Sequence, residues 1–124
     1  MDVIHTAIWV SDLETARSFF VDTLGLEETR SFTVDSTDNV YVGGDHGEIQ
    51  LRFDPDRNHP TPDCSTIDHL AVSADDVDAI VDHIVEETDW SILDGPRTVK
   101  MVDWRVAFVE GPDGYVVELI EDLA

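Results

Sequence analysis

The hydrophobic and polar positions of the chain repeat one order of elements twice. Residues 5–20 read HTAIWVSDLETARSFF and residues 69–84 read HLAVSADDVDAIVDHI. Each segment has a histidine, a short apolar strand, a serine and then an acidic helix start. Apolar residues follow at helical spacing, which predicts one amphipathic helix in each half. The repeat therefore predicts two related structural units.

Both predicted helices carry a start signal. Ser11 with Glu14, and Ser73 with Asp76, have the spacing of a capping box. The first helix is expected to end at Gly25, in the sequence LGLEE. A glycine just past the last turn is a common helix stop.

Alternating and apolar runs predict three more strands in each half. They fall near residues 28–34, 39–43 and 48–53, and near 91–93, 105–110 and 115–120. Each half is therefore β-α-β-β-β, and the fold class is α+β with two paired βαβββ modules forming cupped mixed sheets. We expect a single domain over 1–124, with module one at about 1–56, a linker rich in Pro and Asp at 57–66, and module two at 67–124.

The last predicted strand contains a glutamate that needs a partner. It reads YVVELI after the turn signal GPDG. Both of its faces are otherwise apolar, so the strand is expected to be buried on both sides. An unpaired carboxylate in such a place would cost several kcal/mol or stay protonated. We therefore expect the carboxylate of Glu118 to have a pairing partner.

The repeat supplies that partner. His5 and His69 begin the two halves, and Gln50 and Glu118 occupy matching places in the last strand of each half. Two imidazoles and a carboxylate suit Zn, Ni, Co, Mn or Fe. The duplicated placement predicts a divalent metal site made by His5, Gln50, His69 and Glu118. Taken singly, each histidine would more often be structural, and His46, His59 and His83 are interpreted as solvated.

Composition restricts the partners. With 28 acidic and 7 basic residues the formal net charge is −21, which argues against nucleic acid and anionic membranes as ligands. Lys100 is the only lysine, and acids are spread along the chain, as in proteins of salt-in halophiles. The single cysteine, Cys64, is interpreted as incidental and fits a reducing cytoplasm. No signal peptide or membrane span is evident, so a cytoplasmic location is expected.

Three stretches resemble the vicinal oxygen chelate superfamily, which includes glyoxalase I, extradiol dioxygenases and bleomycin-resistance proteins. They are IHTAIWVSDL, IDHLAVSADDVDA and FVEGPDGYVVELIE, and the last two are most similar to small bacterial glyoxalase I enzymes. The resemblance covers nearly the whole chain. It implies cupped sheets that enclose a divalent metal, with His5, Gln50, His69 and Glu118 at the ligand positions. It also implies a homodimer, because in glyoxalase I the site usually forms between subunits.

Four positions depart from the family pattern. Glyoxalase I usually has glutamate where this chain has Gln50, although a glutamine carbonyl oxygen can bind metal. Trp9 stands where an arginine usually holds a glutathione carboxylate, and Asp54 replaces an expected asparagine. Phe108 replaces the tyrosine of extradiol enzymes and cannot donate a hydrogen bond. The changes at Trp9 and Asp54 argue against ordinary glutathione binding, and Phe108 departs from the extradiol motif.

The resemblance implies a metal-dependent lyase or isomerase of the glyoxalase type. Its substrate would be an α-hydroxycarbonyl or hemithioacetal, converted through a metal-bound enediolate with Glu118 as the base. Two other classes stay open. The triad His5, His69 and Glu118 alone would suit an Fe(II) extradiol dioxygenase. A metal-free small-molecule binder, like the bleomycin-resistance proteins, is the non-enzymatic alternative, with Trp9, Trp90 and Trp104 as possible pocket residues.

Overall fold

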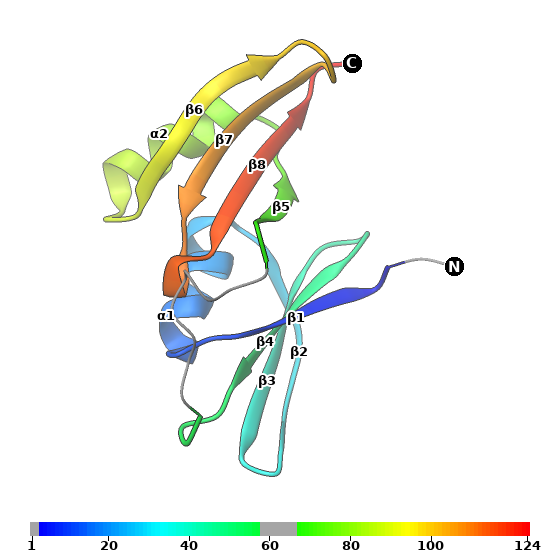
Figure 1. The fold of residues 1–124 in the computed structure, drawn as a ribbon, viewed down its shortest axis with the longest axis vertical. Helices are drawn as coiled ribbons and strands as arrows, with labels where there is room; N and C mark the ends of the chain where they lie inside the picture. The colour runs from blue at the N-terminus through cyan, green and yellow to red at the C-terminus, as the bar shows by residue number, and fades with distance from the viewer. Residues whose placement is uncertain (1–2, 58–66) are drawn as a thin grey trace. The chain divides into compact units, whose positions relative to one another are not determined.

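The computed structural model describes residues 3–57 and 67–124, and the chain divides into two compact units, Met1–Pro60 and Thr61–Ala124. Each unit is a sheet with one helical segment (Figure 1). Cys64 and His59 lie outside the described residues. Among the described residues, no helix has the length and apolar content needed to cross a bilayer.

The first unit contains a four-stranded mixed sheet in the order β1-β4-β3-β2. Strand β1 runs parallel to β4, while β2, β3 and β4 form an antiparallel meander. The elements are β1 (His5–Trp9), α1 (Leu13–Arg17), a π-helical turn η1 (Ser18–Thr23), β2 (Glu27–Val34), β3 (Thr37–Gly43) and β4 (Glu48–Phe53).

The second unit repeats this topology, with the sheet order β5-β8-β7-β6 and β5 parallel to β8. Its elements are β5 (Leu70–Ser73), α2 (Val77–Glu87), β6 (Ser91–Val99), β7 (Trp104–Glu110), the 3-10 turn η3 (Pro112–Gly114) and β8 (Val116–Asp122). The predicted α+β class with two βαβββ modules is confirmed.

Both helices begin one residue after an aspartate and not at a serine capping box. Asp12 Oδ1 accepts the amide of Thr15 at 2.9 Å, and Asp76 Oδ1 accepts the amide of Ala79 at 3.0 Å. A cap must directly precede the first helical residue for its side chain to reach the third amide. The predicted serine caps at positions 11 and 73 are therefore wrong.

Each sheet uses one face for the core. Ile49 and Leu51 on β4 are buried, as are Val117 and Leu119 on β8. Helix α1 contacts β4, and α2 contacts β6, β7 and β8. The alternate residues of both strands, including Glu118, lie on the opposite, half-buried face. Within the second unit the expectation that the last strand is buried on both sides is therefore wrong, because no second layer covers that face in the described part of the unit.

Strand β6 is longer than the sequence predicts. It continues to Val99 through Gly95 and Pro96, with register shifts on both sides of Asp94. Gly95 has φ of +85°, and a Cβ there would lie 2.6 Å from the carbonyl oxygen of Val106. Turn-forming residues thus mark an irregular strand here and not a strand end.

Candidate metal centre

In the first unit, His5 and Gln50 lie on the same face of the sheet. Ala7 pairs with Gln50 across the parallel β1–β4 ladder, and His5 is two residues before Ala7. Side chains two apart in a strand share a face, as do paired residues on neighbouring strands. The His5 ring meets the ring of Tyr41 edge-on, with centroids 5.5 Å apart. Tyr41 is also the β3 partner of Gln50, so these three side chains adjoin.

The amide of Gln50 is held by Asn39. Gln50 Nε2 donates to Asn39 Oδ1 at 2.9 Å, and Arg52 Nε donates to the same oxygen at 3.1 Å. Asn39 is only 3% exposed, and its Nδ2 donates to the carbonyl oxygen of Thr37 at 3.2 Å. The nitrogen end of Gln50 is therefore engaged, and its oxygen end is the one available to a cation.

In the second unit, His69 and Glu118 are in direct contact. His69 Nε2 lies 3.2 Å from Glu118 Oε1, and the Glu118 side chain is 13% exposed. Glu118 pairs with Ala71 on β5 and with Phe108 on β7. The His69 ring meets Phe108 edge-on at 6.0 Å between centroids. Each unit thus places a histidine against an aromatic ring of the third strand, beside the predicted ligand on the fourth.

The hydrogen bonding of His69 fits a cation. Its Nδ1 lies 2.7 Å from Asp68 Oδ2. In the neutral tautomer in which Nδ1–H donates to Asp68, Nε2 carries the lone pair that a metal-ligating imidazole needs. Two acceptor atoms, Nε2 and Glu118 Oε1, then face each other. Adjacent nitrogen and oxygen ligands of a tetrahedral zinc ion lie about 3.3 Å apart, given metal–ligand distances of about 2.0 to 2.1 Å. The observed separation of 3.2 Å matches that spacing.

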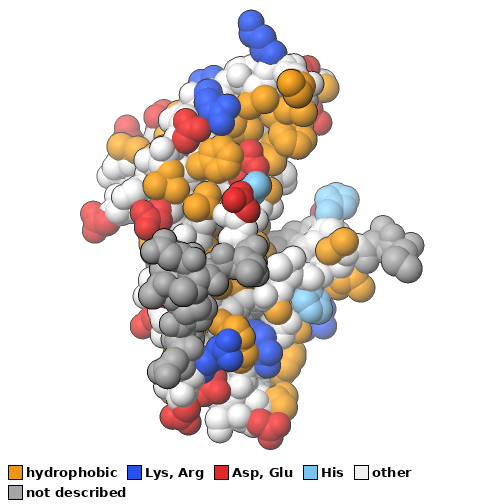
Figure 2. Space-filling model, in the orientation of Figure 1, with side chains coloured by type: hydrophobic (Ala, Val, Ile, Leu, Met, Phe, Trp, Pro, Cys, Tyr) orange, Lys and Arg blue, Asp and Glu red, His pale blue; other side chains and the backbone are white. Residues whose placement is uncertain are grey.

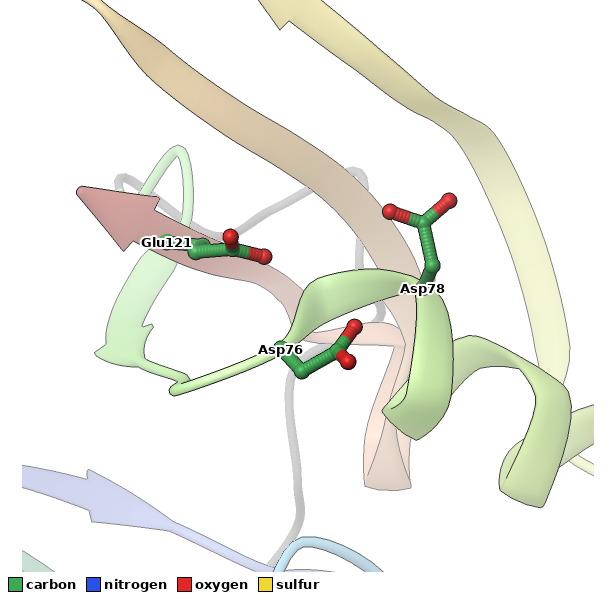
Figure 3. A group of neighbouring side chains, drawn as sticks. All are labelled: Asp76, Asp78 and Glu121. Atoms are coloured by element: carbon green, nitrogen blue, oxygen red, sulfur yellow. The ribbon is translucent and has the colours of Figure 1, made fainter. Parts of the chain in front are cut away.

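A second acidic group lies at the start of α2 (Figure 3). The ligand atoms of Asp76, Asp78 and Glu121 all lie within 4.8 Å of one another. Glu121 Oε1 accepts the amide of Val77 at 2.9 Å, so it supplements the Asp76 cap. Asp78 accepts two hydrogen bonds from Arg105, at 2.8 and 2.9 Å. The hydrogen bonds from Arg105 lower the pKa of Asp78, and this group is accounted for by helix capping and an ion pair.

The open face of unit one also carries positive charge. Arg52 and Arg57 stack on Trp9, with guanidinium carbons 4.5 and 4.1 Å from the ring centroid. The other four arginines each contact a carboxylate: Arg17, Arg30, Arg97 and Arg105. Arg52 and Arg57 have no such contact among the described residues. A separate hollow of about 220 Å³ beside α1 and the β2–β3 hairpin includes none of the four predicted ligands.

The open face of unit two is mainly apolar. Figure 2 shows hydrophobic side chains over the β6–β8 sheet, with acidic side chains scattered over the rest of the visible surface. Around Glu118, this face carries the half-buried residues Phe108, Val116 and Ile120. The carboxylate therefore lies in an apolar setting, where a charged partner is worth more than in water.

Residues 3–119 match the family described as the Glyoxalase/Bleomycin resistance protein/Dioxygenase superfamily. The chain belongs to this superfamily. The vicinal oxygen chelate resemblance expected from the three sequence stretches is thereby confirmed.

Relatives in this superfamily include both an enzyme and a binding protein. A lactoylglutathione lyase of Haemophilus influenzae is 29% identical, over 98% of this chain and 93% of its own length. The trypanothione-dependent glyoxalase I of Leishmania major is 26% identical, with a TM-score of 0.78 over 98% of this chain and 87% of its own. TnmS3, an antibiotic binding protein from Streptomyces sp. CB03234, is 25% identical, with a TM-score of 0.75 over 98% and 96%.

Sequence reasoning found the two pairs but missed the residues around them. His5 with Gln50, and His69 with Glu118, each share one sheet face. Asn39, Asp68 and Tyr41 were not anticipated. Tyr41 has a detectable signal, since it occupies the place in β3 that Phe108 occupies in β7. The role of Asn39 has none, because it depends on the register between β3 and β4.

Proposed function

We propose that the protein is a metal-dependent, glyoxalase I-like lyase or isomerase, with His5, Gln50, His69 and Glu118 as the ligands of one divalent ion. The observation that carries this proposal is the contact between His69 Nε2 and Glu118 Oε1, with Nδ1 already engaged by Asp68. His5 and Gln50 share a face of the other sheet, and both neighbour Tyr41. Together the two pairs would supply four ligands.

The proposed reaction needs a Lewis acid, a base and an apolar environment. When bound, a divalent ion would supply Lewis acidity to two neighbouring oxygens of an α-hydroxycarbonyl. Glu118 would take the proton from one carbon of the substrate and return it to the adjacent carbon, so the reaction is a balanced isomerisation. The apolar surroundings formed by Phe108, Val116 and Ile120 would keep water from competing for that proton.

Gln50 sets the charge of the ligand set. With a neutral amide at this position, the ligand set carries one negative charge, from Glu118. A glutamate at position 50 would bring the total to two. The lower charge should leave the ion a stronger Lewis acid, and it should also weaken the retention of the ion.

A hemithioacetal with an anionic thiol portion is the substrate class we favour. The trypanothione and glutathione in the names of the two enzymes belong to those proteins. Here Arg52 offers positive charge two residues from Gln50 on the same face of β4, and Arg57, which follows β4 in the chain, also stacks on Trp9. They supply what the replacement of an arginine by Trp9 removed, so a carboxylate on the thiol would still find a donor.

Metal binding by matched histidine variants tests the proposal. Metal-free protein would be titrated with Ni²⁺ and Zn²⁺ by calorimetry, for wild type, His69→Ala and His83→Ala. His83 is exposed on α2 and is the control. We expect one ion per chain for wild type and the control, and a loss of at least tenfold in affinity for His69→Ala. Equal affinity in all three proteins would refute the ligand assignment.

Assays of enzymatic activity and of the oligomeric state complete the test. Isomerisation of the hemithioacetals of methylglyoxal with several low-mass thiols should require the added ion. Light scattering in high salt is expected to give a homodimer. Oxygen uptake with a catechol would instead favour the dioxygenase.

A metal-free binder is the second candidate, favoured by the likeness to TnmS3 and the apolar open face of β6–β8. In that case neither ion would bind with 1:1 stoichiometry.

A further inference from the structure

We propose that Asn39 is a positioning residue that fixes Gln50 with its carbonyl oxygen toward the metal, so that the site is built for glutamine and not for glutamate. The inference rests on the function proposed above. It concerns a residue that touches neither of the histidines in any described contact and acts only through the amide of Gln50.

Backbone carbonyl oxygens determine which way the side-chain amide of Asn39 points. Its Nδ2 faces two carbonyl oxygens, of Thr37 at 3.2 Å and of Phe32 at 3.5 Å. Turning the amide over would place Oδ1 against those two oxygens, which are acceptors only. Because Asn39 is 3% exposed, water is poorly placed to relieve that contact. Asn39 therefore presents Oδ1, and only Oδ1, to β4.

Oδ1 in turn requires donors from β4. Gln50 Nε2 and Arg52 Nε provide them at 2.9 and 3.1 Å, which uses both lone pairs of the oxygen. The amide of Gln50 cannot be reversed without setting its own oxygen against Oδ1. The carbonyl oxygen of Gln50 is left as the end that faces away from Asn39, and no described hydrogen bond uses it.

A glutamate at position 50 would meet the same oxygen with an acceptor. One carboxylate oxygen would replace Nε2 at 2.9 Å from Oδ1, with no hydrogen between them. The gain in Coulomb attraction to the metal would be offset by that repulsion. The equivalent position in the second unit carries Val106, which is 1% exposed and has no polar atom in its side chain. Glu118 therefore meets no such acceptor, and a glutamate is tolerated there.

A double-mutant cycle tests the coupling. Zn²⁺ and Ni²⁺ affinities would be measured by calorimetry for wild type, Gln50→Glu, Asn39→Ala and the double variant. Both backgrounds receive the same added charge, so the comparison removes the general Coulomb effect of the substitution. We expect Gln50→Glu to raise affinity about tenfold more in the Asn39→Ala background than in wild type, in line with coupling between contacting polar residues. An equal gain in both backgrounds overturns the inference.

A second measurement does not depend on how well Asn39→Ala folds. In wild-type protein labelled with ¹³C and ¹⁵N, Zn²⁺ should shift the side-chain carbonyl carbon of Gln50, while its amide protons keep the shift of a hydrogen-bonded group. A carbonyl carbon that stays fixed while the ring signals of His69 move would also overturn the inference and leave the metal site intact. If neither His69 nor Gln50 responds, the proposed function fails first.

Discussion

Two substitutions of Asp76, to alanine and to asparagine, can test whether the acidic group at the start of α2 caps the helix or binds metal. Asp76 caps the helix through one hydrogen bond from Ala79, and Val77 is served independently by Glu121. Asparagine caps a helix about as well as aspartate, whereas alanine does not, and the loss costs about 1 kcal/mol. Unfolding entropy for a chain of 124 residues is about 0.26 kcal/mol per kelvin, so Asp76→Ala should lower Tm by about 4 °C and Asp76→Asn by less than about 1 °C.

Scanning calorimetry in high salt gives the Tm values, and metal titration of the same proteins decides the function of the group. If the group is a cap, Asp76→Asn binds one ion as wild type does, and His69→Ala binds it at least tenfold more weakly. If the group is the metal site, Asp76→Asn should lose metal affinity and His69→Ala should keep it. Full metal binding by His69→Ala together with its loss in Asp76→Asn would refute our interpretation of both groups.

Three further predictions follow from single features. Glu118→Gln should abolish turnover and still retain part of the metal affinity, measured by calorimetry beside the rate, because His5, Gln50 and His69 remain; full activity would exclude Glu118 as the base. Tm should rise steeply with KCl, since the net charge of −21 repels itself across a screening length of about 30 Å at 0.01 M salt, and a flat profile would remove the halophile interpretation. The pKa of Asp78 is lowered in the fold by Arg105, so its contribution is present above the ordinary value of 3.8 and is lost as pH falls through the folded pKa. At high salt, Asp78→Asn should therefore lose less Tm than wild type on acidification below about pH 4; identical acid profiles for Asp78→Asn and wild type would contradict this.

The repeat could be predicted from the sequence because each element leaves a local signal. Histidine, strand and acidic helix start recur in order, Gly25 marks the end of the first helix, and the predicted bounds of β4, Glu48–Phe53, are the observed ones. Gly95 and Pro96 are typical of a turn, so the sequence predicts a shorter β6 than the structure has. The helix caps were misassigned because Ser11 and Asp12, like Ser73 and Asp76, are both good caps by type. Only the observed helix start chooses between them.

The residue types of the candidate site follow from the sequence, and their arrangement does not. Matching positions in the repeat named His69 and Glu118, and the 3.2 Å contact agrees with that pairing. The hydrogen bond between Gln50 and Asn39 depends on the β3–β4 register, in which Asn39 is opposite Arg52 and is diagonal to Gln50. No spacing rule reveals such a diagonal contact before the register is known.

The two proposed nitrogen ligands would have a particular importance in a chain this acidic. With 28 carboxylate side chains, hard cations such as Mg²⁺ would find oxygen ligands almost anywhere on the surface, and a carboxylate alone could not single out one site. Imidazole favours Zn, Ni, Co and Fe over Mg and Ca. Two histidines held on sheet faces, one by an aromatic ring and the other by an aromatic ring and Asp68, would therefore supply the selectivity, and Glu118 would supply the charge. We accordingly expect excess Mg²⁺ in high salt to leave Ni²⁺ or Zn²⁺ affinity nearly unchanged in competition calorimetry. Displacement of either ion by millimolar Mg²⁺ would mean that oxygen ligands, and not His5 and His69, hold the metal.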